Sequence, residues 1–373
     1  MGNKLYVNAT ILHEKPSGLG VYAENIIKCL RDAKVEMKVF APINIEGVDV
    51  IKTTKYVKPS YKKKGGLMRF IYTQFVLPFK VHGDAIIYHP FQYLSLLSRK
   101  KQVITIHDFI PLYYKEVAKH QYKYYKYIMP LLLKKAYKII CISQNTKDDL
   151  MKFYNVPEHK VHVIYNGYNK EIYNTENVEN AEEMLKENYN IDYPYIVMVG
   201  AEYTHKNIRR AMEAFSKVQH RKNTKLVLIG KDSEYIRGLK EYAKELNIEE
   251  EVKFVGYVPT EHLKALYYRA DAFLYPTLYE GFGLPVLEAW GCDTLVLCSN
   301  NSSVKEIAGE GAITFNPEST EEISNAIKKV IDARNSEDKE LIEEIERIKL
   351  VAKENLKNYN WEKTSKEILK VIQ

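Results

Sequence analysis

The sequence predicts an α/β protein made of two doubly wound domains, each with a parallel sheet covered by helices. Short apolar runs typical of buried strands alternate with helical stretches in both halves of the chain. Glycine-containing turns follow strands in both halves, where a doubly wound sheet brings its backbone N–H groups to a ligand. The length of 373 residues exceeds one typical domain and suits two of ordinary size.

The N-terminal half begins with a βαβ unit, and short strands then recur. Gly18 and Gly20 form its first strand-to-helix turn, where a binding role and a purely conformational role are both open. Residues 52–83 read as an exposed basic loop followed by a packed amphipathic helix. The expected strands are 4–10, 35–41, 85–88, 102–106 and 138–143, with a helix over 21–31.

The second half starts after a shift in composition to acidic and Asn-rich sequence. The predicted organisation is a first domain over 1–172, a linker over 173–192, a second domain over 193–357 and a terminal segment over 358–373. In the second domain the expected strands are 195–200, 225–230, 252–256, 272–276 and 294–298, and the expected helices are 208–219, 233–246 and 260–268.

The most informative stretch is EGFGLPVLEA, residues 280–289, which follows a buried strand and leads into a helix. Gly281 and Gly283 allow a sharp bend that brings backbone N–H groups to the start of the helix, a favourable seat for phosphate. Glu280 and Glu288 flank this seat. Because carboxylates repel phosphate, sugar hydroxyls are their natural partners there. The alternative is an ordinary strand–turn–helix with a glutamate in its first turn.

Two other polar residues stand where strands end. His107 follows the strand 102–106, at the edge where open α/β sheets bind ligands. Lys206 lies in the loop after the strand 195–200, from which a lysine can reach a phosphate as a point charge. The alternatives are a histidine that caps a strand and a solvated lysine at a helix start, for which Asn207 is the expected N-cap.

The sequence has no export signal at its N-terminus and no apolar run near the roughly 18–20 residues that span a bilayer. We therefore expect a cytoplasmic protein. Its four cysteines, Cys29, Cys141, Cys292 and Cys298, form no CxxC pair and are expected to be small core residues in a reducing compartment.

Positive charge is concentrated in the first half. Residues 1–170 hold 28 Lys and Arg against 12 Asp and Glu, whereas residues 171–373 hold 27 against 36. Residues 113–138 combine seven lysines with seven tyrosines. This favours an anionic membrane surface, at the inner face of the cell membrane, as a partner. No nucleic-acid-binding signature accompanies them, so no nucleic-acid partner is expected; a plain solvated face is the alternative.

The two glutamates, separated by seven residues with GFGLP between them, resemble the signature of retaining glycosyltransferases of family four. The resemblance implies the GT-B fold, in which two Rossmann-like domains face a central cleft and a terminal helix crosses back to the first domain. It assigns Glu288 to the nucleotide ribose and Glu280 to the donor sugar.

The remaining motifs fit the same family. SGLGVY resembles its N-terminal glycine loop, TIHDFIPL its His-Asp element and GAEYTHKN its phosphate-binding loop. The resemblance implies that Lys206 binds phosphate and that His107 approaches the donor sugar. It implies donor contacts from Gly18, Gly20 and the backbone of Gly281, Phe282, Gly283 and Leu284.

By this resemblance the protein moves a sugar from a GDP- or UDP-linked donor to an acceptor hydroxyl on a glycan or lipid-linked acceptor, with retention. The products would be cell-surface polysaccharide or glycolipid intermediates. The residues of the HKN loop and of EGFGLPVLEA together resemble those of members that use a mannosyl-type donor. No Asp-x-Asp metal signature is present, so no metal or other cofactor is expected.

One departure from the family pattern and two rival functions stay open. Ala201 stands where many members carry an arginine, and His205, Arg209 or Arg210 are the candidates to replace that cation. An NAD-type enzyme is one rival, although no complete G-x-G-x-x-G with a following acidic residue occurs. A non-enzymatic protein that binds membranes or nucleic acid through its basic half is the other.

Overall fold

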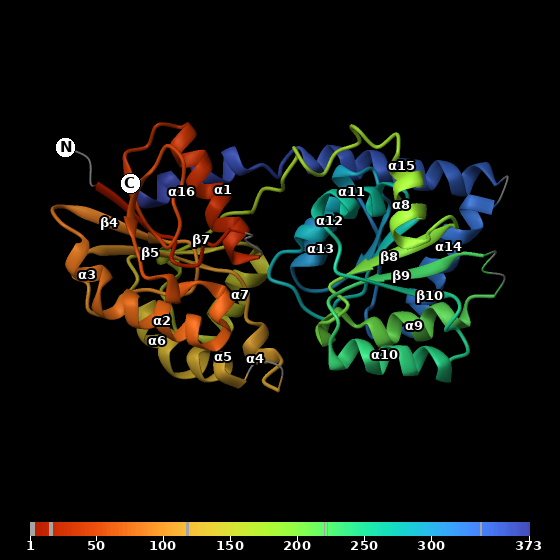
Figure 1. Ribbon diagram of the computed structural model, residues 1–373, viewed down its shortest axis with the longest axis horizontal. Helices are drawn as coiled ribbons and strands as arrows, with labels where there is room; N and C mark the ends of the chain where they lie inside the picture. Colours follow the sequence, from red (N-terminus) through yellow and green to blue (C-terminus); the bar gives the residue numbers. More distant parts are fainter. Residues whose placement is uncertain (1–3, 15–17, 117–118, 220, 222, 336–337) are drawn as a thin grey trace. The chain divides into compact units, whose positions relative to one another are not determined.

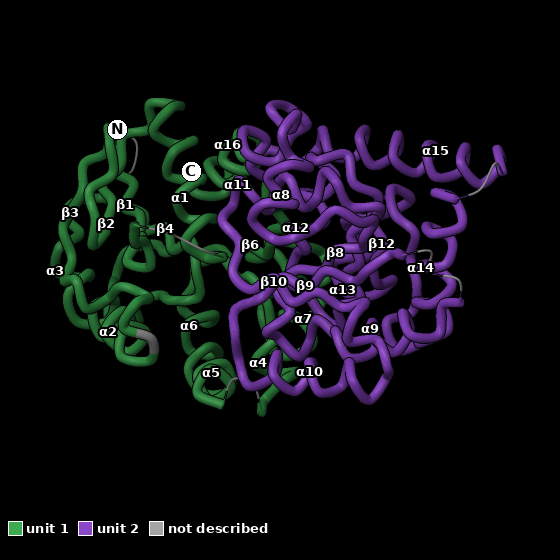
Figure 2. Tube along the Cα trace, turned by 45° about the vertical axis from the view of Figure 1, so that its right-hand side comes forward, with its two compact units in different colours: residues 1–167, 361–373 green, residues 168–360 purple. Residues whose placement is uncertain are grey.

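The computed structural model describes residues 4–14, 18–116, 119–219, 221, 223–335 and 338–373, and Figure 1 shows their helices and strands. The chain forms two compact units (Figure 2). Unit 1 comprises residues 1–167 and 361–373, and unit 2 comprises residues 168–360. Each unit is an α/β domain with its own parallel sheet, as the alternation of strands and helices in the sequence predicts.

In the described part of unit 1, seven parallel strands pair in the order β3-β2-β1-β4-β5-β6-β7. The strands are β1 Lys4–Asn8, β2 Met37–Ala41, β3 Asp49–Lys52, β4 Ala85–His89, β5 Lys101–Ile106, β6 Lys138–Cys141 and β7 Val161–Val163. The helices are α1 Leu19–Asp32, α2 Lys62–Phe75, α3 Leu77–Lys80, α4 Ile110–Tyr113, α5 Lys119–Lys123, α6 Met129–Lys135, α7 Gln144–Phe153 and α16 Trp361–Ile372. A π-helical turn, Tyr124–Ile128, joins α5 to α6.

In the described part of unit 2, six parallel strands pair in the order β10-β9-β8-β11-β12-β13. The strands are β8 Tyr195–Val199, β9 Lys225–Ile229, β10 Val252–Gly256, β11 Ala272–Tyr275, β12 Val296–Ser299 and β13 Ile313–Phe315. The helices are α8 Ala181–Tyr189, α9 Ile208–Lys217, α10 Glu234–Glu245, α11 Thr260–Tyr268, α12 Leu284–Gly291, α13 Ser302–Ala308, α14 Thr320–Asn335 and α15 Lys339–Leu356.

The central strands are mostly apolar because helices cover both faces of each sheet. Every residue of β4 and of β11 is buried. Helix α9 shows how a helix covers the sheet: Ile208, Ala211, Met212 and Phe215 recur at helical spacing and are fully buried. This core fixes where the strands end, and therefore where the loops that carry polar side chains begin.

The strand order reverses beside the first strand of each sheet. In unit 2, β8 lies between β9 and β11, so the loops after β8 and β11 leave the same edge of the sheet in opposite directions. Such a reversal opens a crevice at the carboxyl ends of the strands, the usual ligand site of an open α/β sheet. The loop after β8 contains Lys206, and the loop after β11 contains Glu280.

The unit boundaries differ from the expected domain limits. Residues 173–192, expected as a linker, group with unit 2 and contain α8, which contacts α11. Ala181 and Leu185 of this helix are buried, which explains why the acidic segment packs onto the unit.

The terminal helix α16 groups with unit 1, where Trp361 contacts the ring of Tyr22 at 5.8 Å and Thr364 donates a hydrogen bond of 2.8 Å to the Tyr165 carbonyl. No helix among the described residues is both long and apolar enough to cross a membrane.

Candidate functional site

The loop after β8 has a strained path that places Lys206. Gly200 takes a φ of 72° directly after the strand, and a 3-10 turn over Thr204–Lys206 precedes α9. Asn207 also has a positive φ, 58°, and its side chain does not cap the helix as expected. Instead its amide donates to the Pro317 carbonyl at 2.7 Å, which fixes the end of the turn.

The loop after β11 is held from two sides. The N–H of Leu278 donates to the His205 carbonyl at 2.8 Å, which joins this loop to the one after β8. On the other side, Ser302 Oγ accepts from the N–H of Glu280 at 3.2 Å, and Ser303 Oγ donates to the Glu280 carbonyl at 2.9 Å. Hydrogen bonds to its backbone therefore hold Glu280 in place, in addition to the contacts of its side chain.

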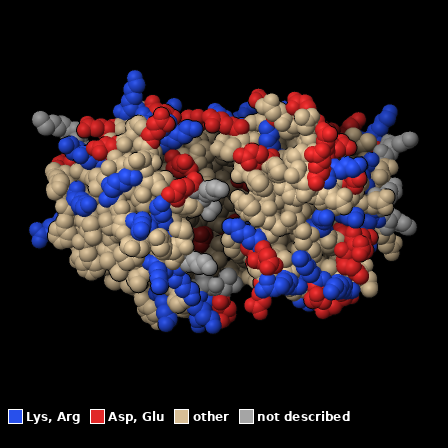
Figure 3. All heavy atoms as spheres, viewed as in Figure 1, with Lys and Arg blue, Asp and Glu red and all other residues tan. Residues whose placement is uncertain are grey.

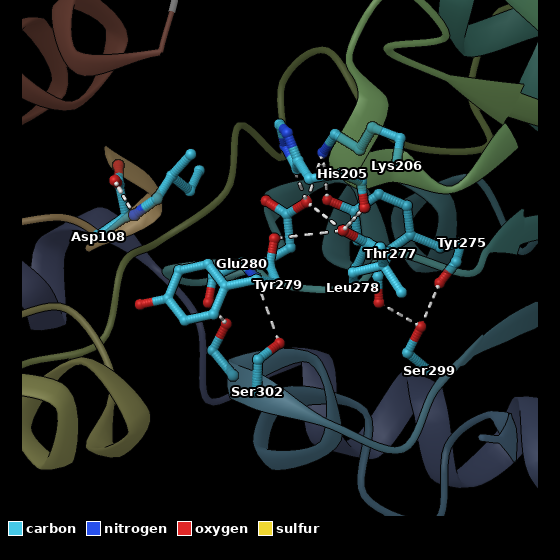
Figure 4. A network of polar contacts seen from close by, with 12 residues as sticks. Asp108, His205, Lys206, Tyr275, Thr277, Leu278, Tyr279, Glu280, Ser299 and Ser302 are labelled. Atoms are coloured by element: carbon cyan, nitrogen blue, oxygen red, sulfur yellow. Dashed lines mark hydrogen bonds and ion pairs between the residues drawn. The ribbon is translucent and has the colours of Figure 1, made fainter. Parts of the chain in front are cut away.

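The Glu280 carboxylate and the Lys206 ammonium form the centre of the site (Figure 4). Lys206 Nζ lies 2.7 Å from Glu280 Oε1 and donates to the hydroxyl of Tyr275 at 2.7 Å. Thr277 Oγ1 donates to the same Glu280 oxygen at 2.8 Å. Both charged side chains are only 12% exposed, so the low local dielectric strengthens the pair.

The protonation of these groups follows from burial and pairing. Burial opposes ionisation of Glu280, but Lys206, His205 and the Thr277 hydrogen bond outweigh it and hold the carboxyl pKa below its usual value. Burial lowers the pKa of His205 to about 4, so its imidazole is neutral at pH 7, with Nε2 3.8 Å from Glu280 Oε1. The centre therefore carries one negative and one positive charge at neutral pH.

The glycine turn 281–284 leads directly from Glu280 into α12. Gly283 has a φ of 103°, which a residue with a Cβ rarely adopts, and a Cβ there would lie 3.4 Å from a methyl of Val304. The Phe282 side chain is buried, with its ring 6.1 Å from that of Tyr359, so only its backbone can serve a ligand. Helix α12 begins at Leu284, so Pro285 lies in its first turn.

Glu288 lies one turn inside α12 and is partly buried. Burial raises the pKa of its carboxyl to about 7, although a hydrogen bond from Tyr173 and the charge of Lys206 act in the opposite direction. A carboxyl with this pKa is partly ionised at neutral pH and accepts hydrogen bonds from hydroxyl groups. This is compatible with the expected ribose contact.

Three predicted residues lie in unit 1. Gly18 precedes α1 with a φ of 51°, and no atom of the described residues outside its chain neighbours lies within 4 Å of where its Cβ would stand. Gly20 is buried inside the helix. His107 follows β5 and is 6% exposed; its Nε2 lies 2.8 Å from the Pro90 carbonyl, so the ring carries its proton on this nitrogen. Burial lowers its pKa to about 4. Tyr22 packs edge-on against His107 at 4.7 Å, which joins the glycine turn to the end of β5.

The three candidates to replace the arginine that many family members carry at the position of Ala201 differ in charge and contacts. His205 is neutral at pH 7, as described above. The Arg209 guanidinium stacks on the ring of Tyr242 at 3.7 Å, and Arg210 donates to the Pro317 carbonyl at 3.0 Å. Each arginine is thus engaged with another part of unit 2, whereas His205 lies beside Glu280 with its Nε2 3.8 Å from Oε1.

The sequence did not single out Tyr275, Thr277, Ser302 or Ser303, although all four contact Lys206 or Glu280. Thr277 could have been predicted as a site residue, because it stands two residues beyond a buried strand, where such sheets bind ligands. Ser302 and Ser303 had no comparable signal, because their role depends on how α13 packs beside the loop. Among the described residues, no three His, Cys, Asp or Glu side chains converge in a manner that could hold a metal ion.

Two family models match the chain in sequence. The model "Glycosyltransferase Family 4" matches residues 16–172, and the model "Glycosyl transferases group 1" matches residues 179–347. The chain is 30% identical over 231 residues to the O-antigen chain mannosyltransferase RfbU of Salmonella typhimurium, a match that spans 62% of this chain and 61% of that protein. It is 26% identical over 332 residues to O-antigen chain mannosyltransferase B of Escherichia coli, over 83% and 85% of the two chains.

The fold agrees with the sequence matches. The structure of Anabaena HepE in complex with UDP and glucose superimposes with a TM-score of 0.74, over 99% of each chain at 17% identity. This likeness concerns the fold, two parallel-sheet domains of GT-B type. Together the two family models cover both units and all the motifs described above. The chain belongs to glycosyltransferase family four, the group 1 glycosyltransferases with the GT-B fold.

Proposed function

We propose that the protein transfers a hexosyl group from a nucleotide-sugar to an acceptor hydroxyl. The observation that carries this proposal is the Lys206–Glu280 pair, fixed at 2.7 Å beside the glycine turn 281–284 and the start of α12. A buried cation, backbone N–H groups and a carboxylate occur here within one short stretch of the crevice. This combination suits a ligand that has both phosphate and sugar hydroxyl groups.

The reaction breaks the bond between the anomeric carbon and the phosphate oxygen, and the acceptor oxygen takes its place. Negative charge then grows on the phosphate, where Lys206 and the N–H groups of the glycine turn stabilise it. Positive charge grows on the sugar ring, and the Glu280 carboxylate is suited to it. The acceptor proton passes to the departing phosphate, which allows retention of configuration.

The donor is a GDP- or UDP-linked sugar in this proposal. Two relatives are named as mannosyltransferases of O-antigen chains, and the structural neighbour was solved with UDP and glucose. These names support a hexose donor, with mannose preferred, and an acceptor that is a growing glycan or a lipid-linked glycan. Glu288 binds the nucleotide ribose, and His107, Gly18 and Gly20 serve the sugar end. No metal takes part.

The site of action follows from the acceptor. A lipid-linked glycan is confined to a membrane, so the protein works in the cytoplasm at the inner face of the cell membrane. The basic segment 113–138, with exposed side chains of Lys119, Lys123 and Lys126, supports an approach to anionic lipid. The product is an intermediate of cell-surface polysaccharide or glycolipid synthesis.

The experiment that tests the donor site is a thermal unfolding panel with GDP, UDP, ADP and their sugars, each with and without EDTA, and with NAD. A ligand at about a hundred times its dissociation constant stabilises the folded state by about 2.7 kcal/mol, which is readily measured. We expect stabilisation by GDP or UDP and by its sugar that EDTA does not change. Stabilisation by NAD alone would favour the dinucleotide enzyme instead.

Two variants test whether the nucleotide binds at Lys206. Lys206→Ala removes the phosphate cation and is expected to abolish most of the shift. Lys217→Ala removes an exposed lysine at the end of α9, the helix that follows the Lys206 turn. Lys217 pairs with Glu213, and this variant should keep the wild-type shift. An equal loss in both variants, or none in either, would contradict the proposed site.

A further inference from the structure

Helix α2 and the short helix α3 have an exposed apolar face that the fold of unit 1 does not use. Leu67, Ile71, Phe75 and Phe79 are 59%, 36%, 60% and 74% exposed. They recur every four residues, so they share one side of the helical segment. We name these four side chains the apolar stripe. The sequence predicts a packed amphipathic helix here, and the stripe shows that only part of the segment is packed.

The opposite face of the same helices already forms the contact with the sheet. Tyr72 and Leu77 are buried in a cluster with Tyr6, Phe40 and Ile87, while Met68 and Val76 pack at its margin. The stripe is therefore additional to the core. Two large exposed phenylalanines on one surface are costly in water and usually mark a contact surface.

The charged residues of the segment that carries the stripe are all basic. Between Asp49 and Asp84 the sequence contains no acidic residue but seven lysines and one arginine. The exposed side chains of Lys63 and Lys64 precede the stripe on the helix, and that of Lys80 follows it. An apolar face with lysines at both ends is the pattern of a helix that lies in a membrane interface.

The basic segment 113–138 lies next to this helix. The ring of Phe70 in α2 is 6.1 Å from that of Tyr124 in the π-helical turn. The neighbouring segment contributes the exposed apolar side chains of Tyr127 and Leu131. Its exposed lysines are Lys115, Lys119, Lys123, Lys126, Lys134 and Lys135. Figure 3 shows Lys and Arg side chains gathered at this end of unit 1, over α5 and α6.

We infer that the apolar stripe inserts into the interfacial layer of an anionic lipid bilayer, while the lysines around it contact lipid headgroups. A bilayer satisfies both demands of the surface, because it offers hydrocarbon and negative charge together. A second copy of the chain does not fit as well, because pairing two such faces would bring two sets of lysines together. The inference does not rest on sugar transfer.

The test is co-sedimentation of the full chain with vesicles of phosphatidylcholine alone or mixed with phosphatidylglycerol. The wild-type protein should bind the anionic vesicles and not the neutral ones. The double variant Phe75→Ser/Phe79→Ser should bind at least about tenfold more weakly. Both side chains are exposed, so this variant should fold as the wild type does. Leu350→Ser on α15 changes a side chain of similar exposure, 64%, outside the stripe and should bind normally.

A second measurement separates insertion from simple charge attraction. The native tryptophans, Trp290 and Trp361, are buried, so an indole introduced by Phe79→Trp reports the stripe directly. Its emission should shift to shorter wavelength with anionic vesicles. Wild-type binding by the serine double variant, absence of the shift, or failure of the wild type to bind anionic vesicles would each overturn the inference. Dimerisation of the wild type that the double variant abolishes, without lipid binding, would overturn it in favour of a second copy.

Discussion

At the scale of single residues, the Lys206–Glu280 pair explains how a carboxylate can lie close to the proposed phosphate site. Alone, Glu280 would repel a pyrophosphate and would be costly to bury. Paired with Lys206 at 2.7 Å and with Thr277 at 2.8 Å, it stays ionised in a site that has no net charge. The ammonium can interact with a phosphate while the carboxylate remains fixed by its backbone contacts with Ser302 and Ser303.

The variant Glu280→Gln tests the division of roles. It removes negative charge near the phosphates, so nucleoside diphosphate binding should be unchanged or tighter. It also removes the group suited to the developing positive sugar, so turnover should fall about a hundredfold or more. Because Lys206 loses its counter-ion, the free energy of unfolding should fall by about 1–3 kcal/mol.

The matched control for this variant is Glu213→Gln, which alters an exposed pair with Lys217 on α9. It should keep turnover and change stability by less than about 0.5 kcal/mol. Titration calorimetry and steady-state kinetics give the two readouts. Normal turnover in Glu280→Gln, or a loss of nucleotide binding equal to the loss of turnover, would contradict the roles assigned here.

Glu288 predicts a pH dependence of stability. Folding raises the pKa of its carboxyl from 4.5 to about 7, so the folded state favours the protonated form. The stability that this group contributes is fully present below pH 4.5 and is lost as the pH rises through 7. Relative to Glu288→Gln, the wild type should therefore lose up to about 3 kcal/mol between pH 5 and pH 8.

Urea unfolding of the two proteins at both pH values measures this loss, and other titrating groups cancel in the difference. The same difference at pH 5 and pH 8 would show that the carboxyl is not perturbed. Glu288→Gln should also weaken nucleoside diphosphate binding, because an amide accepts the ribose hydroxyls less strongly than a carboxylate does.

At the scale of helices and strands, the sequence predicted the central strands well because most of them are short apolar runs that are buried in the sheet. It did not predict the edge strands β3 and β13, which are short and partly exposed. The β11–turn–α12 element was predicted from its glycines, and Gly283 indeed has the positive φ that only glycine adopts easily. The contacts of Thr277 and Ser302 could not be predicted, because they depend on how α13 and two loops meet in space.

Two other elements show where local sequence misleads. The acidic segment 173–192 has the composition of a linker, yet α8 buries Ala181 and Leu185 against unit 2. Asn207 has a good N-cap side chain, but its amide bonds to Pro317, 110 residues away. In both cases a tertiary contact outweighs local preference. The apolar stripe was missed for the same reason, since the sequence does not reveal which face of an amphipathic helix the core will take.

At the scale of the whole molecule, both units are α/β domains with a parallel sheet, but the first half of the sequence is basic and the second half is acidic. Unit 1 is basic and has the apolar stripe, whereas the Lys206–Glu280 site lies in unit 2, in the acidic half of the sequence. The two functions proposed here, lipid contact and donor binding, thus fall on different units. Changes to the stripe should leave donor binding intact, and changes to Lys206 should leave lipid binding intact.

The measurement that tests the central claim most directly is nucleotide release from GDP- and UDP-sugars by the wild type and by Lys206→Ala, with EDTA present and a membrane extract as acceptor. We expect the wild type to release one nucleotide, with sugar transferred to the extract, and the variant to lose about a hundredfold or more in turnover. Release by both proteins at the same rate, or by the wild type only when metal is added, would contradict the account.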